Sequence, residues 1–150
     1  MSGTTNIPVV SVIIRKDNKV LLIHRSGTGY MDGYYCGPGG HVEDHESFAQ
    51  AAQREVKEEI GISVTPEQLS FTCMLHENYI DADVRVAAVF EITQWQGEPY
   101  NAEPEKHDDM GWFALDELPE NLVPTYITAL QNLDKGNGYA EYGWQSELTT

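Results

Sequence analysis

The sequence predicts a mixed α/β fold of the α+β class, in which a mixed β-sheet has helices packed on its faces. Three observations carry this prediction. Apolar, β-branched segments surround one strongly amphipathic segment, a second helical segment follows a proline near the C-terminus, and glycine and proline cluster between them. The chain has 150 residues, of which 41% are hydrophobic, and this suits one domain with its own core.

Apolar segments rich in β-branched residues predict the strands. The first two form a hairpin, because Asp17 and Asn18 between them favour a turn. In the segment 84–93, apolar side chains occupy every second position, as in a strand with one buried face. The predicted strands are Ile7–Ile14, Val20–His24, Leu69–Tyr79, Val84–Thr93 and a short one at Trp112-Phe113.

One segment shows clear helical periodicity. Between Ser47 and Ile60, apolar side chains recur at steps of four residues, and Gly61 can end the helix. The glycine-rich stretch 27–40 comes before it and predicts a loop with unusual backbone angles.

The C-terminal part predicts a second helix and a tail. Pro124 can open a helix that runs to about Leu133. From about residue 136 to 150 no clear pattern is present. We expect this segment and residues 1–6 to be loosely held tails of a single domain that spans residues 1–150. The aromatic side chains expected in the core, rather than as platforms for base stacking, are Phe71, Trp112 and Phe113.

The composition argues against several classes of function. There are 24 acidic and 9 basic residues, which gives a net charge of −15 with neutral histidines. This charge opposes nucleic-acid binding, which needs a basic stripe, and docking on anionic lipid. No apolar run could span a bilayer, the N-terminus lacks a signal-peptide pattern, and the two cysteines lack metal or disulfide spacing. We expect a cytoplasmic protein without a nucleic-acid or membrane partner.

The acidic residues are concentrated in two segments. Residues 40–62 carry six acids and two bases, and residues 98–120 carry eight acids and one base. Such clusters are usually solvated surfaces. In the first, however, Glu55, Glu58 and Glu59 fall at i, i+3 and i+4, and thus on one flank of the predicted helix. Because like charges repel there, a divalent cation held by carboxylate oxygens would relieve the conflict.

The same segment contains a motif with nine specified positions. Gly40 is followed after five residues by Glu46 and after seven more by the run Arg54 to Ile62, REVKEEIGI. Every specified position matches the Nudix box, GX5EX7REUXEEXGU, where U is a bulky aliphatic residue. The chain thus resembles the MutT-type Nudix domains, most clearly over residues 7–133.

The resemblance implies the Nudix fold, an α/β/α sandwich around a central mixed sheet with a loop-helix-loop catalytic motif. It also implies a hydrolase that cleaves a nucleoside diphosphate linked to another group, with Mg2+ as cofactor and Mn2+ as a substitute. In size the chain is most similar to the family's enzymes that cleave a (deoxy)nucleoside triphosphate, including oxidised nucleotides, to monophosphate and pyrophosphate. A small nucleotide is then the substrate, and a homodimer is allowed.

The resemblance assigns roles to the residues of the box. Metal ligation is implied for Glu58, Glu59 and the backbone carbonyl of Gly39. Glu55 is either a further ligand or the general base that activates water. Glu46 is expected to support a second metal or its water shell.

Other roles concern positioning, a ligand outside the box and contacts with the substrate. Arg54 is expected to orient the carboxylates rather than to contact substrate. One more metal ligand is expected from the second acidic segment, where Glu103 fits best by its offset from the Gly-Glu-Pro tripeptide at 97–99, and Glu105 is the runner-up. The candidates for substrate binding are Arg25, Gly40 and His41. Each also has a structural alternative: Arg25 as an ordinary charge at a strand end, Gly40 as a residue needed for backbone shape, and His41 as a loop histidine without a catalytic role.

Two other functions stay open at this point. Within the family, the substrate could be ADP-ribose or a nucleoside diphosphate sugar. Outside catalysis, a Nudix fold can serve as a nucleotide-binding regulatory module. Such modules usually lose carboxylates of the box, and this chain keeps them all.

Overall fold

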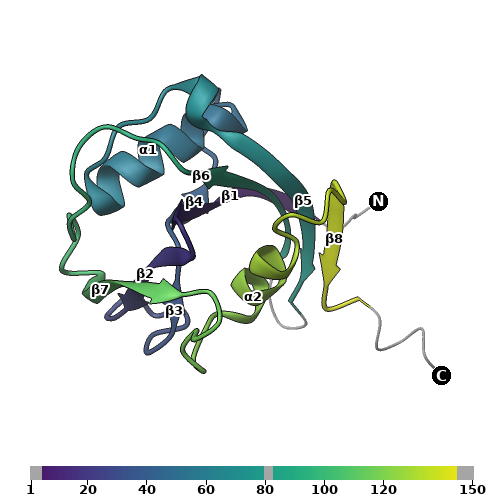
Figure 1. Cartoon of the computed structure of the whole chain (residues 1–150). Helices are drawn as coiled ribbons and strands as arrows, with labels where there is room; N and C mark the ends of the chain where they lie inside the picture. Colours follow the sequence, from purple (N-terminus) through teal and green to yellow (C-terminus); the bar gives the residue numbers. More distant parts are fainter. Residues whose placement is uncertain (1–4, 80–82, 145–150) are drawn as a thin grey trace.

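The computed structural model describes residues 5–79 and 83–144, which form a mixed sheet of eight strands with two α-helices and one short 3-10 helix (Figure 1). The predicted fold class is confirmed. The elements are β1 (Asn6–Lys16), β2 (Lys19–Arg25), β3 (Tyr35–Cys36), β4 (Gly39–His41), α1 (Phe48–Ile60), η1 (Pro66–Gln68), β5 (Ser70–Asn78), β6 (Val84–Ile92), β7 (His107–Ala114), α2 (Pro124–Gln131) and β8 (Tyr139–Tyr142).

Strand β1 is the centre of the sheet. It pairs in parallel with β6 along most of its length, and antiparallel with β4 in its middle and with β2 at its end. Beyond β6 follow β5, which is antiparallel, and β8, which is a parallel edge strand. On the other side, β2 pairs with β3 and β7. The strand that carries the glycines before the box, β4, is thereby held directly on the central strand.

The two helices explain why β1 is apolar without a clear alternation. Helix α1 packs on β1 and β4, whereas α2 contacts β1, β5 and β8, and Figure 1 shows them on opposite sides of β1 and β6. A strand covered on both faces buries every side chain. Accordingly, Val12, Ile13 and Ile14 are fully buried in succession.

Helix α1 is fixed at both ends by local signals of the sequence. Ser47 is the N-cap, whose hydroxyl accepts a hydrogen bond from the Gln50 amide, while the Gln50 side chain accepts one from the Ser47 amide. At the other end, Gly61 adopts a left-handed conformation with φ of 72° and donates to the Lys57 carbonyl. The buried apolar residues of the helix are Ala51, Ala52, Val56 and Ile60.

Several boundaries differ from the sequence-based expectation. The short strand expected at Trp112-Phe113 is part of the longer β7, because β7 pairs with the whole of β2. The glycine-rich stretch 27–40 contains β3 and β4 in addition to turns. Residues 139–142, in the segment for which a loose tail was expected, pair with β5 as β8.

The expectation of buried aromatic side chains was wrong for two of three residues. Phe71 is 54% exposed and Trp112 is 37% exposed, while Phe113 is partly buried against the core. The register of β5 against β6 shifts just after Phe71, which leaves its ring at the strand end on Phe90. Trp112 lies on the outer side of β7 and stacks on Trp95 at a centroid distance of 6.1 Å.

Neither helix of the described residues has the length and apolar character needed to cross a lipid bilayer.

The end of α1 gives a first testable prediction. Replacing Gly61 with alanine places a Cβ at positive φ and against the ring of Tyr100, so both strain and a clash oppose it. We expect Gly61→Ala to lower the free energy of unfolding by about 1–3 kcal/mol in urea denaturation. Gly138→Ala is the matched control, because a Cβ there meets no atom within 4 Å, and an equal loss in both variants would contradict the argument.

Candidate active site

The carboxylates of α1 border a cavity of about 630 Å3, a volume typical of small-molecule sites. Its walls come from β1, β4, α1, β5, β6 and α2, from the ends of β2 and β3 with the loop between them, and from the segment that leads into β7. Glu55 and Glu59 line it, and Glu59 is only 6% exposed. Glu58 is half-exposed and lies beside the cavity rather than in its lining.

Two glycines allow α1 to approach β4 closely. The amide of Gly39 donates a hydrogen bond of 2.9 Å to the Glu59 carboxylate, and this ties the helix to the strand. At Gly40 a Cβ would collide with the carboxylate of Glu55. Gly40 therefore acts through the space that it leaves, which explains in physical terms why the box begins with glycine.

Arg54 connects the remaining carboxylates of the box. Its Nε and Nη2 donate to both oxygens of Glu46, at 2.8 and 3.0 Å, in a bidentate pair. Its Nη1 donates to Glu55 at 3.3 Å and to Glu58 at 3.2 Å, and Nη2 also donates to the carbonyl of His41 at 3.0 Å. The hydrogen bonds from Arg54 lower the pKa of Glu46, which stays ionised. Arg54 and Glu46 thus orient α1 and do not line the cavity.

The buried Glu59 and the partly buried Glu55 are electrostatically unfavourable on their own. Burial raises the pKa of Glu59, although the Gly39 amide opposes the rise. Burial also raises the pKa of Glu55, and the neighbouring Glu59 carboxylate adds to the effect. A divalent cation would favour the ionised form of both. The site therefore fits a hard cation by its charge and by its oxygen donors.

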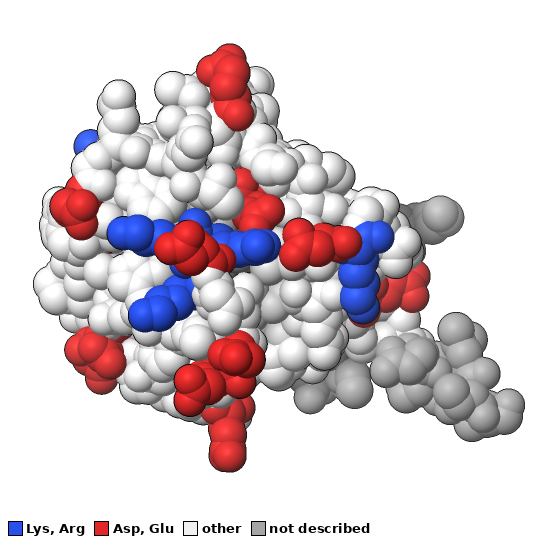
Figure 2. Space-filling model, viewed as in Figure 1, with Lys and Arg blue, Asp and Glu red and all other residues white. Residues whose placement is uncertain are grey.

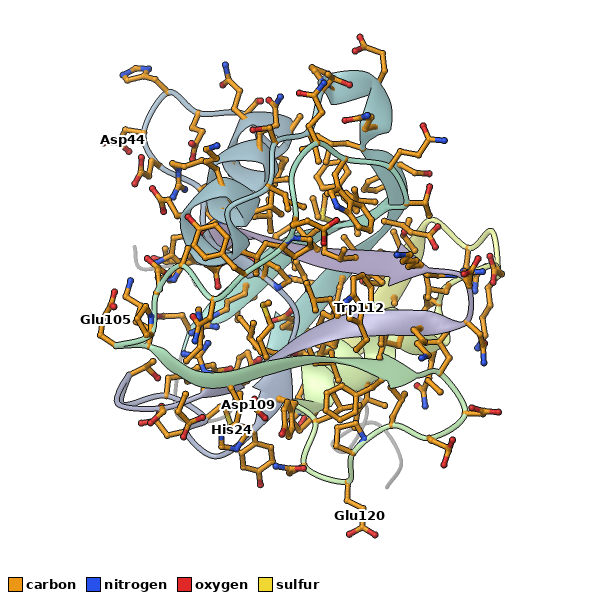
Figure 3. The ribbon with its side chains drawn as sticks, turned by 60° about the vertical axis from the view of Figure 1, so that its left-hand side comes forward. His24, Asp44, Glu105, Asp109, Trp112 and Glu120 are labelled. Carbon is orange, nitrogen blue, oxygen red and sulfur yellow. The ribbon has the colours of Figure 1, made fainter. Side chains whose placement is uncertain are left out.

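A third wall brings further donors to the same place. Glu103 lines the cavity, whereas Glu105 is exposed and Figure 3 shows it at the margin of the molecule, pointing outward. Glu59, Glu103 and His107 each offer one ligand atom, and these atoms lie within 4.8 Å of one another. The structure thus brings Glu103, but not Glu105, to the carboxylates of the helix.

His107 is a residue that the sequence analysis missed. It is 2% exposed, and its Nε2 lies 3.5 Å from Glu59. Burial lowers the pKa of His107, so the neutral imidazole, which can accept or ligate, is favoured. The sequence signal that could have identified His107 is its position four residues after Glu103, at the start of a strand.

Basic side chains complete the outer part of the cavity. Arg25 lies at the end of β2, and its guanidinium donates to the Tyr30 carbonyl at 2.7 Å and to the Thr28 hydroxyl at 3.0 Å. Lys106 lies 3.5 Å from Glu103, and both line the cavity with Arg25. His41 also lines it, with an exposed side chain. Figure 2 shows the same mixture on a larger scale, since basic groups cross the middle of the face viewed, with acidic groups between and around them.

The inner part of the cavity holds a second polar group of residues. We call it the inner cluster, and its members are Glu77, Arg85, Tyr30, Tyr79 and Thr125. The Tyr30 hydroxyl donates to Tyr79 at 3.1 Å, and the Tyr79 hydroxyl donates to Thr125 at 3.3 Å. Burial raises the pKa of Glu77 to about 7, although Arg85 and Tyr79 oppose the rise.

Known proteins are similar to this chain in sequence and in fold. The chain is 36% identical to an 8-oxo-dGTP diphosphatase of Proteus vulgaris, over 58% of its own length and 75% of the relative. It is 29% identical to a CTP pyrophosphohydrolase of Escherichia coli, over 83% of its own length and 89% of the relative.

The structure agrees with these relatives. It superposes on the crystal structure of a MutT NUDIX hydrolase from Burkholderia pseudomallei with a TM-score of 0.80 and 31% identity, covering 86% of this chain and 98% of that one. The model of the NUDIX domain matches residues 5–133, which include the box, the cavity and both helices. The chain therefore belongs to the Nudix family of hydrolases.

Proposed function

We propose that this protein is a divalent-metal-dependent pyrophosphohydrolase that cleaves a (deoxy)nucleoside triphosphate, including an oxidised one, to monophosphate and pyrophosphate. The observation that carries the proposal is the convergence of Glu55 and Glu59 with Glu103 on one cavity that also presents Arg25 and Lys106. Acids without basic groups would repel a polyphosphate, and bases alone would not hold a cation. This cavity offers both.

The names of the relatives support the same reaction class. The protein of Proteus vulgaris is an 8-oxo-dGTP diphosphatase and that of Escherichia coli is a CTP pyrophosphohydrolase. Both names describe hydrolysis of a nucleoside triphosphate. At these identities they support the reaction class more strongly than any one base.

Mg2+, or Mn2+ in its place, fits the donor set of the site. The groups that would hold it are the carboxylates of Glu55, Glu58, Glu59 and Glu103 and the carbonyl of Gly39. A bound divalent ion would neutralise the phosphate charge, polarise the phosphorus and lower the pKa of a bound water. Glu46 would act at one remove, since both of its oxygens are engaged by Arg54.

The protein's own residues would handle the proton and the phosphates. Glu55 would serve either as a further ligand or as the group that takes a proton from attacking water, and a bound cation would keep its carboxylate ionised although burial raises its pKa in the metal-free protein. Arg25 and Lys106 would bind the phosphate oxygens as charged donors. His41 is the exposed last residue of β4, and its carbonyl accepts a hydrogen bond from Arg54, so its main contribution would be to hold β4 and α1 together.

A nucleotide panel decides between this function and its alternatives. We would measure formation of the nucleoside monophosphate, the product common to all of these substrates, from nucleoside triphosphates, ADP-ribose and nucleoside diphosphate sugars, with and without Mg2+ or Mn2+. Preference for triphosphates supports the proposal, preference for ADP-ribose or a sugar nucleotide moves the substrate within the family, and no turnover favours a binding module. A homodimer, a cytoplasmic location and the lack of a nucleic-acid partner stay predictions from the sequence.

The box carboxylates give a second testable prediction. We expect Glu58→Gln and Glu59→Gln each to reduce metal-dependent kcat/KM by at least about 100-fold, because a ligand to the cation is lost. EDTA should abolish the wild-type activity, and Mg2+ should restore it. Glu67→Gln, an exposed acid on η1, is the control and should keep near-normal activity. Near-normal turnover in both box variants, with unchanged thermal unfolding, would refute their role as ligands.

A third prediction separates the two candidates outside the box. Because Glu103 lines the cavity and Glu105 is exposed, we expect Glu103→Gln to raise the Mg2+ concentration for half-maximal activity by about 10-fold or more. Glu105→Gln should change it less than about twofold, which is the usual range for an exposed side chain. A larger effect at Glu105 would transfer the ligand role to that residue.

A further inference from the structure

The inner cluster faces the same cavity as the metal-binding groups but takes no part in the reaction described above. Glu77 on β5 lies directly opposite Arg85 on β6, and directly opposite residues share one face of a sheet. Two residues along, Ala87 lies opposite Val9 of β1, which lines the cavity. The pair Glu77 and Arg85 is therefore built into the cavity wall on two neighbouring strands.

This pair is not arranged as a closed structural ion pair. Glu77 is only 5% exposed, yet among residues 5–79 and 83–144 no ion pair within 4.0 Å joins it to Arg85. The Nε of Arg85 is buried and has no hydrogen-bond partner. Buried donors and charges are normally satisfied, so the Nε of Arg85 is a donor that a group bound in the cavity could use.

Aromatic contacts hold the guanidinium of Arg85 in place. Its Cζ lies 5.1 Å from the ring centroids of both Tyr30 and Tyr79. Arg25, at the phosphate end, lies 5.2 Å from the same Tyr30 ring. The inner cluster is therefore preorganised and continuous with the groups that would bind the phosphates.

We propose that the inner cluster binds the nucleobase of the substrate, and that Glu77 and Arg85 select guanine. The Glu77 carboxylate would accept hydrogen bonds from guanine N1–H and from the 2-amino group, which are adjacent donors. Arg85 would donate to the O6 acceptor, in keeping with the preference of arginine for guanine. This inference rests on the proposed function, because it names the base of the nucleotide that the site would hydrolyse.

The other bases fit the pair less well. Cytosine and adenine each present one amino donor beside a ring-nitrogen acceptor, so an ionised carboxylate would face a lone pair. Hypoxanthine keeps N1–H and O6, and thymine likewise presents N3–H and O4, but both lack the 2-amino group. Sites built to hydrogen-bond a substrate group strongly disfavour an analogue without it, because buried polar atoms are left unpaired.

Binding of monophosphates tests this inference without hydrolysis. By titration calorimetry at pH 8 with Mg2+, we expect the wild type to bind dGMP at least about 10-fold more tightly than dIMP, and dCMP more weakly than either. Glu77→Gln should lower the affinity for dGMP to that for dIMP, and it should change the affinity for dIMP less than about threefold. Arg85→Lys should weaken dGMP and dIMP alike, because both contain O6.

The control is Glu91→Gln, which removes an acid from the far end of β6 and should leave the ratio of dGMP to dIMP affinity unchanged. Thermal unfolding shows whether each variant is folded. If Glu77→Gln is not folded, the inference is tested by the ratio of dGMP to dIMP affinity in the wild type and by the effect of Arg85→Lys on both affinities. Equal wild-type affinity for dGMP, dIMP and dCMP, or equal weakening of all three by Glu77→Gln, would overturn the inference. Guanine-selective binding without hydrolysis of any nucleotide would support it while refuting the proposed function.

Discussion

The close approach of helix α1 to strand β4 is the constraint on which the rest of the site depends. At Gly39 the backbone amide binds the Glu59 carboxylate, and a Cβ there would collide with the Val10 carbonyl of β1, while at Gly40 the missing side chain makes room for Glu55. Because β4 pairs with the central strand β1, the carboxylates are held against the most deeply buried part of the sheet. Rigid support of this kind is what a catalytic constellation needs.

The same approach concentrates like charges in a place that water reaches poorly. Glu59 is buried and Glu55 beside it is partly buried, and of these two carboxylates Arg54 contacts only Glu55. The protein alone can relieve the repulsion by retaining protons, which raises the pKa of both groups. A bound cation would relieve the repulsion while leaving both carboxylates ionised. The repulsion between the carboxylates lowers the stability of the metal-free protein, and the same carboxylates would favour binding of a cation.

The sequence was most informative where chemistry depends on local spacing. The helical segment Ser47–Ile60 and its row of glutamates were predicted from steps of three and four residues, its end was predicted from Gly61, and the Nudix box identified the family. It was least informative about residues brought together by pairing of distant strands. His107 and Arg85 stand in segments without any motif, and only the registers of β7 and β6 carry them to the cavity. Phe71 was misplaced for a related reason, because a register shift cannot be read from composition.

Tyr30 has a consequence for how variants of this enzyme should be interpreted. Its ring contacts both Arg25 and Arg85, and its hydroxyl bonds to Tyr79, so one side chain belongs to both ends of the cavity. Free-energy changes add when sites share no partner, and they fail to add when a common residue links them. Substitutions at the two ends should therefore show thermodynamic coupling, and the coupling should disappear when the ring of Tyr30 is removed.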